Sequence, residues 1–166
     1  MLVGESVAMR YALGQPWGAI PALLIVAVTV FLWRPAVALE PIFAPGGIAI
    51  KGADPVAYFV DGKPRNGNKK FSHDWNGATW LFVNAENRDK FATNPKVYSP
   101  QYGGYCAYAI GNGYTAKIDP DAWKIVGNKL YLNYNKAVRL LWMARQSHYI
   151  KEANRNWPRI LDGSLG

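Results

Sequence analysis

An uncharged run near the N-terminus constrains the rest of the chain more than any other feature of the sequence. Residues 19–33 contain no charged side chain and consist mostly of Ala, Ile, Leu and Val. The run is about as long as a signal-peptide core, and it is short for a bilayer span of roughly 20 residues. A folded domain therefore has to be built from about 128 residues that follow it, which suits one domain of ordinary size.

Two fates of this N-terminal segment follow from its flanks. Pro35 would stop a hydrophobic helix, and Ala36-Val37-Ala38 supplies the small-x-small pattern that signal peptidase accepts. Cleavage after Ala38, which we favour, leaves a mature chain that begins at Leu39. The alternative is an uncleaved helix over residues 17–39 that contacts the membrane as an anchor. Either way the domain is expected in the periplasm, secreted or anchored to the inner membrane.

The remaining chain divides into a short linker and one domain. Residues 39–47 include two prolines and two glycines, which is typical of a linker. Residues 48–160 hold most of the seven Trp and ten Tyr, enough aromatic surface for a compact core. We therefore assign residues 1–38 to a signal peptide or anchor, 39–47 to a linker and 48–160 to the folded domain.

Short apolar runs and turn dipeptides predict strands and hairpins. Residues 56–60, 79–83, 123–126 and 129–132 are rich in β-forming or alternating side chains. Asp61-Gly62, Asn76-Gly77 and Gly127-Asn128 are dipeptides that favour tight hairpin turns, and the last gives the clearest hairpin.

Helices are predicted after two asparagines that can cap them. Asn84 precedes a helix over residues 85–93, and Asn135 precedes one that runs to about Ser147. In the second helix Val138, Leu141 and Trp142 have the spacing of a buried face. Residues 148–157 predict a last helix. The expected fold is α+β: a small antiparallel sheet with hairpins, one central helix and C-terminal helices, preceded by the N-terminal hydrophobic helix.

The net charge of +8 raises the question of a polyanionic partner. No basic run is longer than Lys69-Lys70, and no nucleic-acid-binding motif is present. We therefore expect a solvated basic surface and no nucleic-acid partner.

Several segments together resemble the YHS domain family, over roughly residues 48–158. The resemblance lies in Gly52–Phe59 (GADPVAYF), Asn76–Phe82 (NGATWLF), Ala85–Phe91 (AENRDKF), Asn94-Pro95, Tyr98, Gln101–Ala107 (QYGGYCA), the Trp123–Tyr134 hairpin and Asn156–Pro158. It is closest to single-domain, exported bacterial members, and it implies the α+β fold and a metal-binding module.

The metal-binding members of that family carry a Phe-Cys-x-x-x-Cys stretch at a strand-to-helix junction. Aligning Phe82 and Phe91 with their counterparts places the two cysteines at Val83 and Asn87. Valine cannot ligate a metal and an Asn amide is a poor ligand for soft ions, so this metal site does not carry over.

The chemistry that remains centres on the single cysteine, Cys106. It is either a buried structural thiol or a ligand-binding group, and copper, zinc and haem are candidate ligands. Partner ligands would have to come from His73, His148 or Met143. Each of these has an ordinary structural explanation, as a loop histidine, a histidine at a helix start and a core methionine.

The tyrosines around Cys106 are candidate ligand-binding residues. Tyr102, Tyr105 and Tyr108 alternate with small residues, and aromatic rings with hydroxyls can line a pocket for flat ligands. They could equally belong to a core strand.

No nucleophile elbow, phosphate loop or dinucleotide fingerprint is present, so we expect no enzyme. Two functions stay open: a non-enzymatic periplasmic module that binds a ligand or metal near Cys106, and a membrane-anchored accessory or structural subunit of a larger membrane protein complex.

Overall fold

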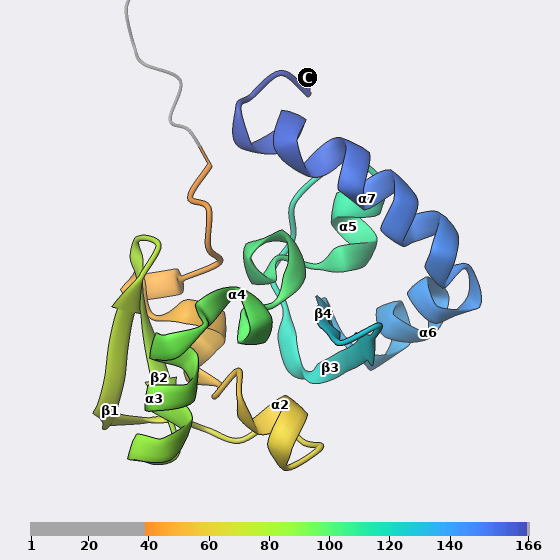
Figure 1. The fold of residues 1–166 in the computed structure, drawn as a ribbon. Coiled ribbons are helices and arrows are strands. Elements are labelled where there is room, and N and C mark those ends of the chain that lie inside the picture. Colours follow the sequence, from red (N-terminus) through yellow and green to blue (C-terminus); the bar gives the residue numbers. More distant parts are fainter. Residues whose placement is uncertain (1–38, 166) are drawn as a thin grey trace, which may run out of the picture. The chain divides into compact units, whose positions relative to one another are not determined.

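The computed structural model describes residues 39–165, and these residues form an α+β fold, as predicted (Figure 1). The predicted N-terminal hydrophobic helix lies outside the described residues. The elements run in the order η1 (Pro45–Gly47), η2 (Ala49–Gly52), α2 (Ala57–Val60), β1 (Asn68–Trp75), β2 (Ala78–Phe82), α3 (Ala85–Thr93), α4 (Pro95–Tyr98), η3 (Gln101–Gly104), α5 (Ala107–Gly111), β3 (Asp119–Val126), β4 (Lys129–Asn133), α6 (Lys136–Ala144) and α7 (Gln146–Leu161).

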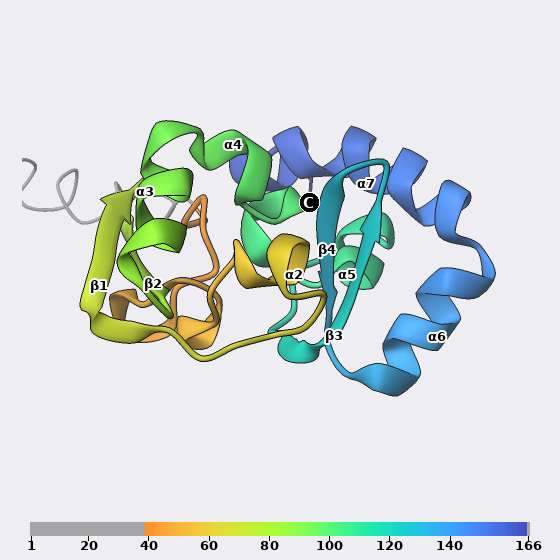
Figure 2. The same cartoon turned by 60° about the horizontal axis from the view of Figure 1, so that its bottom comes forward.

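Two of the three predicted hairpins are present, and each forms its own two-stranded antiparallel sheet. The two central residues of each turn have positive φ, as tight hairpin turns require. The values are 52° and 80° at Asn76-Gly77, and 54° and 57° at Gly127-Asn128. Instead of one sheet, the fold thus has two small sheets. Figures 1 and 2 show the β1–β2 hairpin beside α3, and the β3–β4 hairpin apart from it, nearer α6 and α7.

Both predicted asparagine caps are confirmed. The side-chain oxygen of Asn84 accepts the backbone N–H of Asn87 at 2.8 Å, and that of Asn135 accepts the N–H of Val138 at 2.8 Å. Each bond satisfies a backbone donor that the first helical turn leaves without a partner. Helix α3 therefore spans the predicted residues.

The strand predicted over residues 56–60 is wrong, because this segment forms α2. The carboxylate of Asp54 accepts the N–H groups of Val56 and Ala57 and thereby holds the chain in a helical turn. The hairpin predicted at Asp61-Gly62 is absent as well, since Asp61 ends α2. A local side-chain acceptor, two and three residues before its donors, overrides β-propensity here.

The C-terminal helices differ from their predicted bounds. The helical dihedrals break at Arg145, so α6 ends at Ala144 and α7 starts at Gln146. Helix α7 then runs through Pro158 to Leu161, whereas a stop was predicted there. Trp157 and Ile160, on either side of this proline, both pack against the core, which holds the helix together.

Two apolar clusters fill the interior. The first joins both hairpins to α3 through the fully buried Trp80, Phe82, Phe91, Leu130 and Leu132. The second brings α5, α6 and α7 together around Tyr102, Tyr105, Ile110, Trp142 and Ala153.

The segment predicted as a linker packs into the domain. Ile42 is 4% exposed, and the Phe43 N–H donates to the Gly103 carbonyl at 2.9 Å. A methyl group on Gly103 would collide with the carbonyl of Pro41. The domain thus begins several residues before residue 48.

Within residues 39–165, none of the helices has the length and apolar character needed to cross a bilayer.

Candidate functional site

Cys106 lies directly before α5, and its side chain is almost fully buried at 1% exposure. Its sulfur accepts the backbone N–H of Tyr134 at 3.2 Å and lies 4.0 Å from the side-chain oxygen of Asn133. Burial raises the pKa of the thiol, although nearby backbone N–H groups oppose the shift in part. The thiol is therefore protonated at neutral pH, which makes it a weak nucleophile and a weak metal ligand.

A small pocket opens over this thiol. It has a volume of about 270 Å³ and is lined by Cys106, Tyr108, Ala109, Tyr114, Ala116, Tyr134 and Val138. Tyr114 and Tyr134 are 51% and 40% exposed, so their rings stand at its rim. The ammonium group of Lys117 lies 5.5 Å from the centre of the Tyr134 ring, within range of a cation–π contact. The pocket has an apolar wall of small and aromatic side chains, with one thiol at its base.

Of the three candidate tyrosines, only Tyr108 lines this pocket. Tyr102 donates its hydroxyl to the Asn154 side-chain oxygen at 2.9 Å, and Tyr105 donates to the Glu40 carbonyl at 3.1 Å. Both rings pack against Trp157 in the second core cluster. Tyr102 and Tyr105 therefore belong to the packing of the core. Of the four predicted ligand-binding residues, only Cys106 and Tyr108 line the pocket.

The other candidate metal ligands contact different parts of the domain. His73 lies in β1 with its ring 6.1 Å from that of Phe91, and His148 lies in α7 beside Tyr149. Met143 is 38% exposed on α6, although a core position was expected. Among residues 39–165, no three His, Cys, Asp or Glu side chains gather in a way that could hold a metal ion.

Asn133 is a neighbour of the thiol that the sequence did not single out. It is fully buried at the end of β4, and its side-chain oxygen accepts the Tyr108 N–H at 3.3 Å. Its amide nitrogen has no hydrogen-bond partner. A buried donor without a partner costs about 1–3 kcal/mol. Only the tertiary fold brings this strand end to Cys106, so no local sequence signal could have found it.

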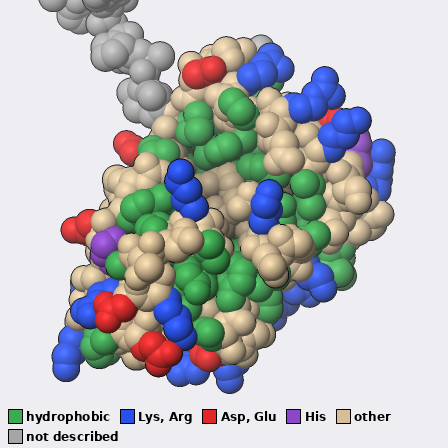
Figure 3. Space-filling model, viewed as in Figure 1, with side chains coloured by type: hydrophobic (Ala, Val, Ile, Leu, Met, Phe, Trp, Pro, Cys, Tyr) green, Lys and Arg blue, Asp and Glu red, His purple; other side chains and the backbone are tan. Residues whose placement is uncertain are grey.

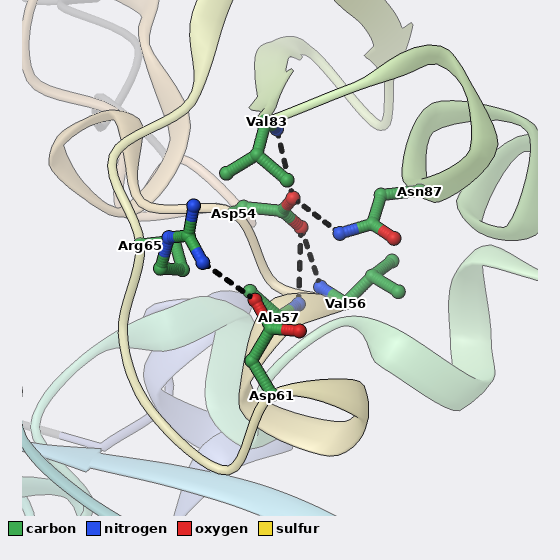
Figure 4. A network of polar contacts seen from close by, with 7 residues as sticks. All are labelled: Asp54, Val56, Ala57, Asp61, Arg65, Val83 and Asn87. Atoms are coloured by element: carbon green, nitrogen blue, oxygen red, sulfur yellow. Dashed lines mark hydrogen bonds and ion pairs between the residues drawn. The ribbon is translucent and has the colours of Figure 1, made fainter.

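A second polar site occupies the junction between β2 and α3 (Figure 4). Asp54 is fully buried, and one of its oxygens accepts the N–H groups of Val56 at 2.8 Å and Ala57 at 3.2 Å. The other accepts the N–H of Val83 at 2.9 Å and the side-chain amide of Asn87 at 2.7 Å. Val83 and Asn87, the two positions that the predicted YHS alignment assigns to cysteines, thus both donate to one carboxylate.

The Asp54 network has a structural role. A buried carboxylate is tolerated when several donors satisfy it, and Asp54 has four. The bonds join the start of α2 to the β2–α3 junction, segments about 30 residues apart. Each oxygen of the carboxylate already accepts two N–H groups, so no group of this network remains for a ligand.

A larger hollow lies elsewhere, along α3 and α4. It measures about 730 Å³, and Lys90 and Glu86, which line it, are already paired with each other at 2.7 Å. This hollow is an open surface groove that is lined by polar side chains and by Val97 and Tyr98. The pocket at Cys106 is smaller but combines an apolar wall with the single thiol, and such a combination is more typical of a ligand site.

Comparison of the chain with protein-family models, with curated proteins and with solved structures found no match.

Proposed function

We propose that this chain is an exported, non-enzymatic binding module of the YHS type, and that its ligand occupies the pocket over Cys106. The observation that carries the proposal is the pocket itself: an apolar recess with exposed tyrosines at its rim and the buried Cys106 thiol among its lining. Compartment and family rest on the N-terminal run and on the sequence resemblance described above.

The lining favours a small, uncharged, flat ligand. A volume of about 270 Å³ is below the roughly 300–1,000 Å³ of pockets for drug-sized molecules, which limits the ligand to about one aromatic ring with its substituents. Tyr108, Tyr114 and Tyr134 offer ring faces for stacking, and no charged side chain lines the described pocket.

A metal ligand is less compatible with this geometry. Zinc or copper would require the thiolate form and further donors. Burial disfavours the thiolate, and neither His73 nor His148 lines the described pocket. The proposal therefore prefers a small aromatic molecule to copper, zinc or haem.

The test is a titration of the purified chain with p-cresol, followed by the backbone amide signals in NMR. We expect saturable shifts at Tyr108 and Tyr134, and loss of these shifts in Ala116→Leu, which fills the pocket. Ala144→Leu, on the exposed side of α6, is the matched control and should bind like the wild type. Shifts that are absent, or that persist unchanged in Ala116→Leu, would overturn the proposal.

Elemental analysis and a haem spectrum of the same preparation test the metal alternative. Copper, zinc or haem that is retained by the wild type and lost in Cys106→Ser would replace the aromatic ligand with a metal-centred one.

The second candidate is a membrane-held accessory subunit, and the exposed apolar side chains of α6 favour it. It requires residues 17–39 to remain in the mature protein. Intact mass spectrometry decides this point, because a mature chain that begins at Leu39 has lost its anchor.

A further inference from the structure

Helix α6 is apolar on nearly all sides, which is unusual for a helix at the surface. Of its nine residues only Lys136 and Arg139 are charged. A helix of this composition is normally buried on every side. Here only Trp142 is fully buried, where its ring packs 5.3 Å from that of Tyr131. The opposite side of α6 therefore presents apolar groups outward.

The outward side carries large apolar side chains. Leu140 is 60% exposed, Leu141 is 57% exposed and Met143 is 38% exposed. Leu141 was predicted to face the core, and the structure places it outside. Ala137 and Ala144 are exposed on the same helix, so the outer side is a continuous apolar strip, which we call the α6 strip (Ala137, Leu140, Leu141, Met143 and Ala144).

Basic side chains are concentrated in the C-terminal part of the fold, to which the α6 strip belongs. Residues 122–161 contain eight basic side chains and one acidic one, Glu152, whereas residues 39–121 contain nine basic and eight acidic ones. The basic residues of this C-terminal part are Lys124, Lys129, Lys136, Arg139, Arg145, Lys151, Arg155 and Arg159. Figure 3 shows Lys and Arg side chains gathered along the edge where α7 lies. Residues 136–161, which span α6 and α7, hold six of these basic residues against Glu152 alone, a net charge of +5 out of the chain's +8.

We propose that the α6 strip and the basic side chains of α6 and α7 dock on the surface of a membrane that contains anionic phospholipids. An apolar helix face bordered by Lys and Arg inserts at the headgroup boundary, where the leucines enter the acyl region and the cations meet lipid phosphates. The long stems of Lys and Arg let them reach the headgroups from beside an inserted helix. This proposal does not depend on the pocket at Cys106.

The basic side chains and the apolar strip together favour an anionic lipid surface over other partners. A nucleic acid would use the cations but would leave Leu140 and Leu141 exposed, because phosphate and sugar contacts come from polar side chains. A second copy of the chain would bury the leucines but would bring two strongly basic surfaces together. Unlike these two, an anionic lipid surface satisfies both features of the same face.

The experiment uses the full chain reconstituted in vesicles, with an environment-sensitive fluorophore attached at Leu140→Cys in a Cys106→Ser background. Vesicles of phosphatidylcholine alone are compared with vesicles that also contain phosphatidylglycerol. We expect blue-shifted emission, and quenching by nitroxide-labelled lipid, only with phosphatidylglycerol. The control carries the label at Val97→Cys on α4, a position that is 46% exposed, and should respond to neither.

Charge removal provides the second arm. Each basic residue near an anionic membrane strengthens binding about fivefold, so Lys136→Gln with Arg145→Gln should lower the ratio of docked to undocked domains about 25-fold. Lys69→Gln with Lys70→Gln, on β1, is the matched control and should leave the ratio unchanged. Added salt should weaken docking as well.

Three results would overturn the proposal. The first is identical emission from the Leu140 label in both kinds of vesicle. The second is an equal response at Val97. The third is a response to added duplex DNA or RNA in the absence of phosphatidylglycerol, which would assign the surface to nucleic acid.

Discussion

Replacing Asp54 by Asn tests whether the buried carboxylate holds the start of α2 against the β2–α3 junction. The substitution keeps the size of the side chain and exchanges one oxygen for an NH₂ group. Each oxygen of Asp54 accepts two N–H donors, so either orientation of the new amide points its NH₂ at two donors. Two hydrogen bonds are lost, and their donors stay buried without partners.

The expected loss follows from these bonds. A hydrogen bond to a charged group contributes about 1.5–3 kcal/mol, so losing two predicts a loss of about 3–6 kcal/mol in the free energy of unfolding. If the NH₂ faces Val83 and Asn87, the Asn87 amide can rotate and offer its oxygen, which recovers one bond and favours the lower end. A domain has about 5–15 kcal/mol in total, so the variant should be marginal.

Urea unfolding followed by far-UV circular dichroism measures this loss. Asp74→Asn is the matched control, because Asp74 is exposed and bonds only to the Thr79 hydroxyl, at 2.7 Å; it should change stability by less than about 0.5 kcal/mol. Asn87→Ala removes a single donor from Asp54 and should cost about 1.5–3 kcal/mol. The double variant of Asp54→Asn and Asn87→Ala should lose less than the sum, since the two residues share a bond.

A loss below about 1 kcal/mol in Asp54→Asn would refute this reasoning, because two unsatisfied buried donors cannot be that cheap. Equal losses in Asp54→Asn and Asp74→Asn would refute it too, since they would make burial irrelevant.

Three other variants test separate parts of the fold. Gly103→Ala should release the segment around Pro41 and destabilise the domain far more than Gly77→Ala. Both glycines have positive φ, but a methyl group would collide with the Pro41 carbonyl at Gly103 and would meet no atom at Gly77. Limited proteolysis near residue 41 and urea midpoints compare the two. Asn135→Ala should cost about 1 kcal/mol through loss of the α6 cap, read from the same urea curves. Burial raises the pKa of the Cys106 thiol in the folded chain. The free energy of unfolding is therefore unaffected by this group at neutral pH, and it falls as pH rises above about 8.5, where the thiol of the unfolded chain ionises first. Between pH 8 and 9.5 the urea midpoint should therefore decline more in the wild type than in Cys106→Ser, and equal declines would contradict the role of the thiol.

The sequence by itself determined the elements whose signals are local. The two hairpins form at Asn76-Gly77 and Gly127-Asn128 because these residues adopt positive φ readily, and α3 starts at Asn84 because its side chain can cap the first turn. These preferences act over four or five residues and need no partner from elsewhere in the chain. The α+β class followed from them.

Tertiary structure decided everything that depends on distant partners. Residues 56–60 have a strand-like composition but fold as α2, because the nearby Asp54 accepts the N–H groups of Val56 and Ala57; the tertiary part of this network is its bonds to Val83 and Asn87. The tyrosines at 102, 105 and 108 look alike in the sequence, yet only Tyr108 reaches the pocket. Asn133 became a neighbour of Cys106 only through the packing of β4 against the start of α5, and Leu141 faces outward because Trp142 takes the core side of α6. Hydrogen bonds and apolar contacts between segments far apart in sequence have no signature in a short window, so only the folded chain reveals them.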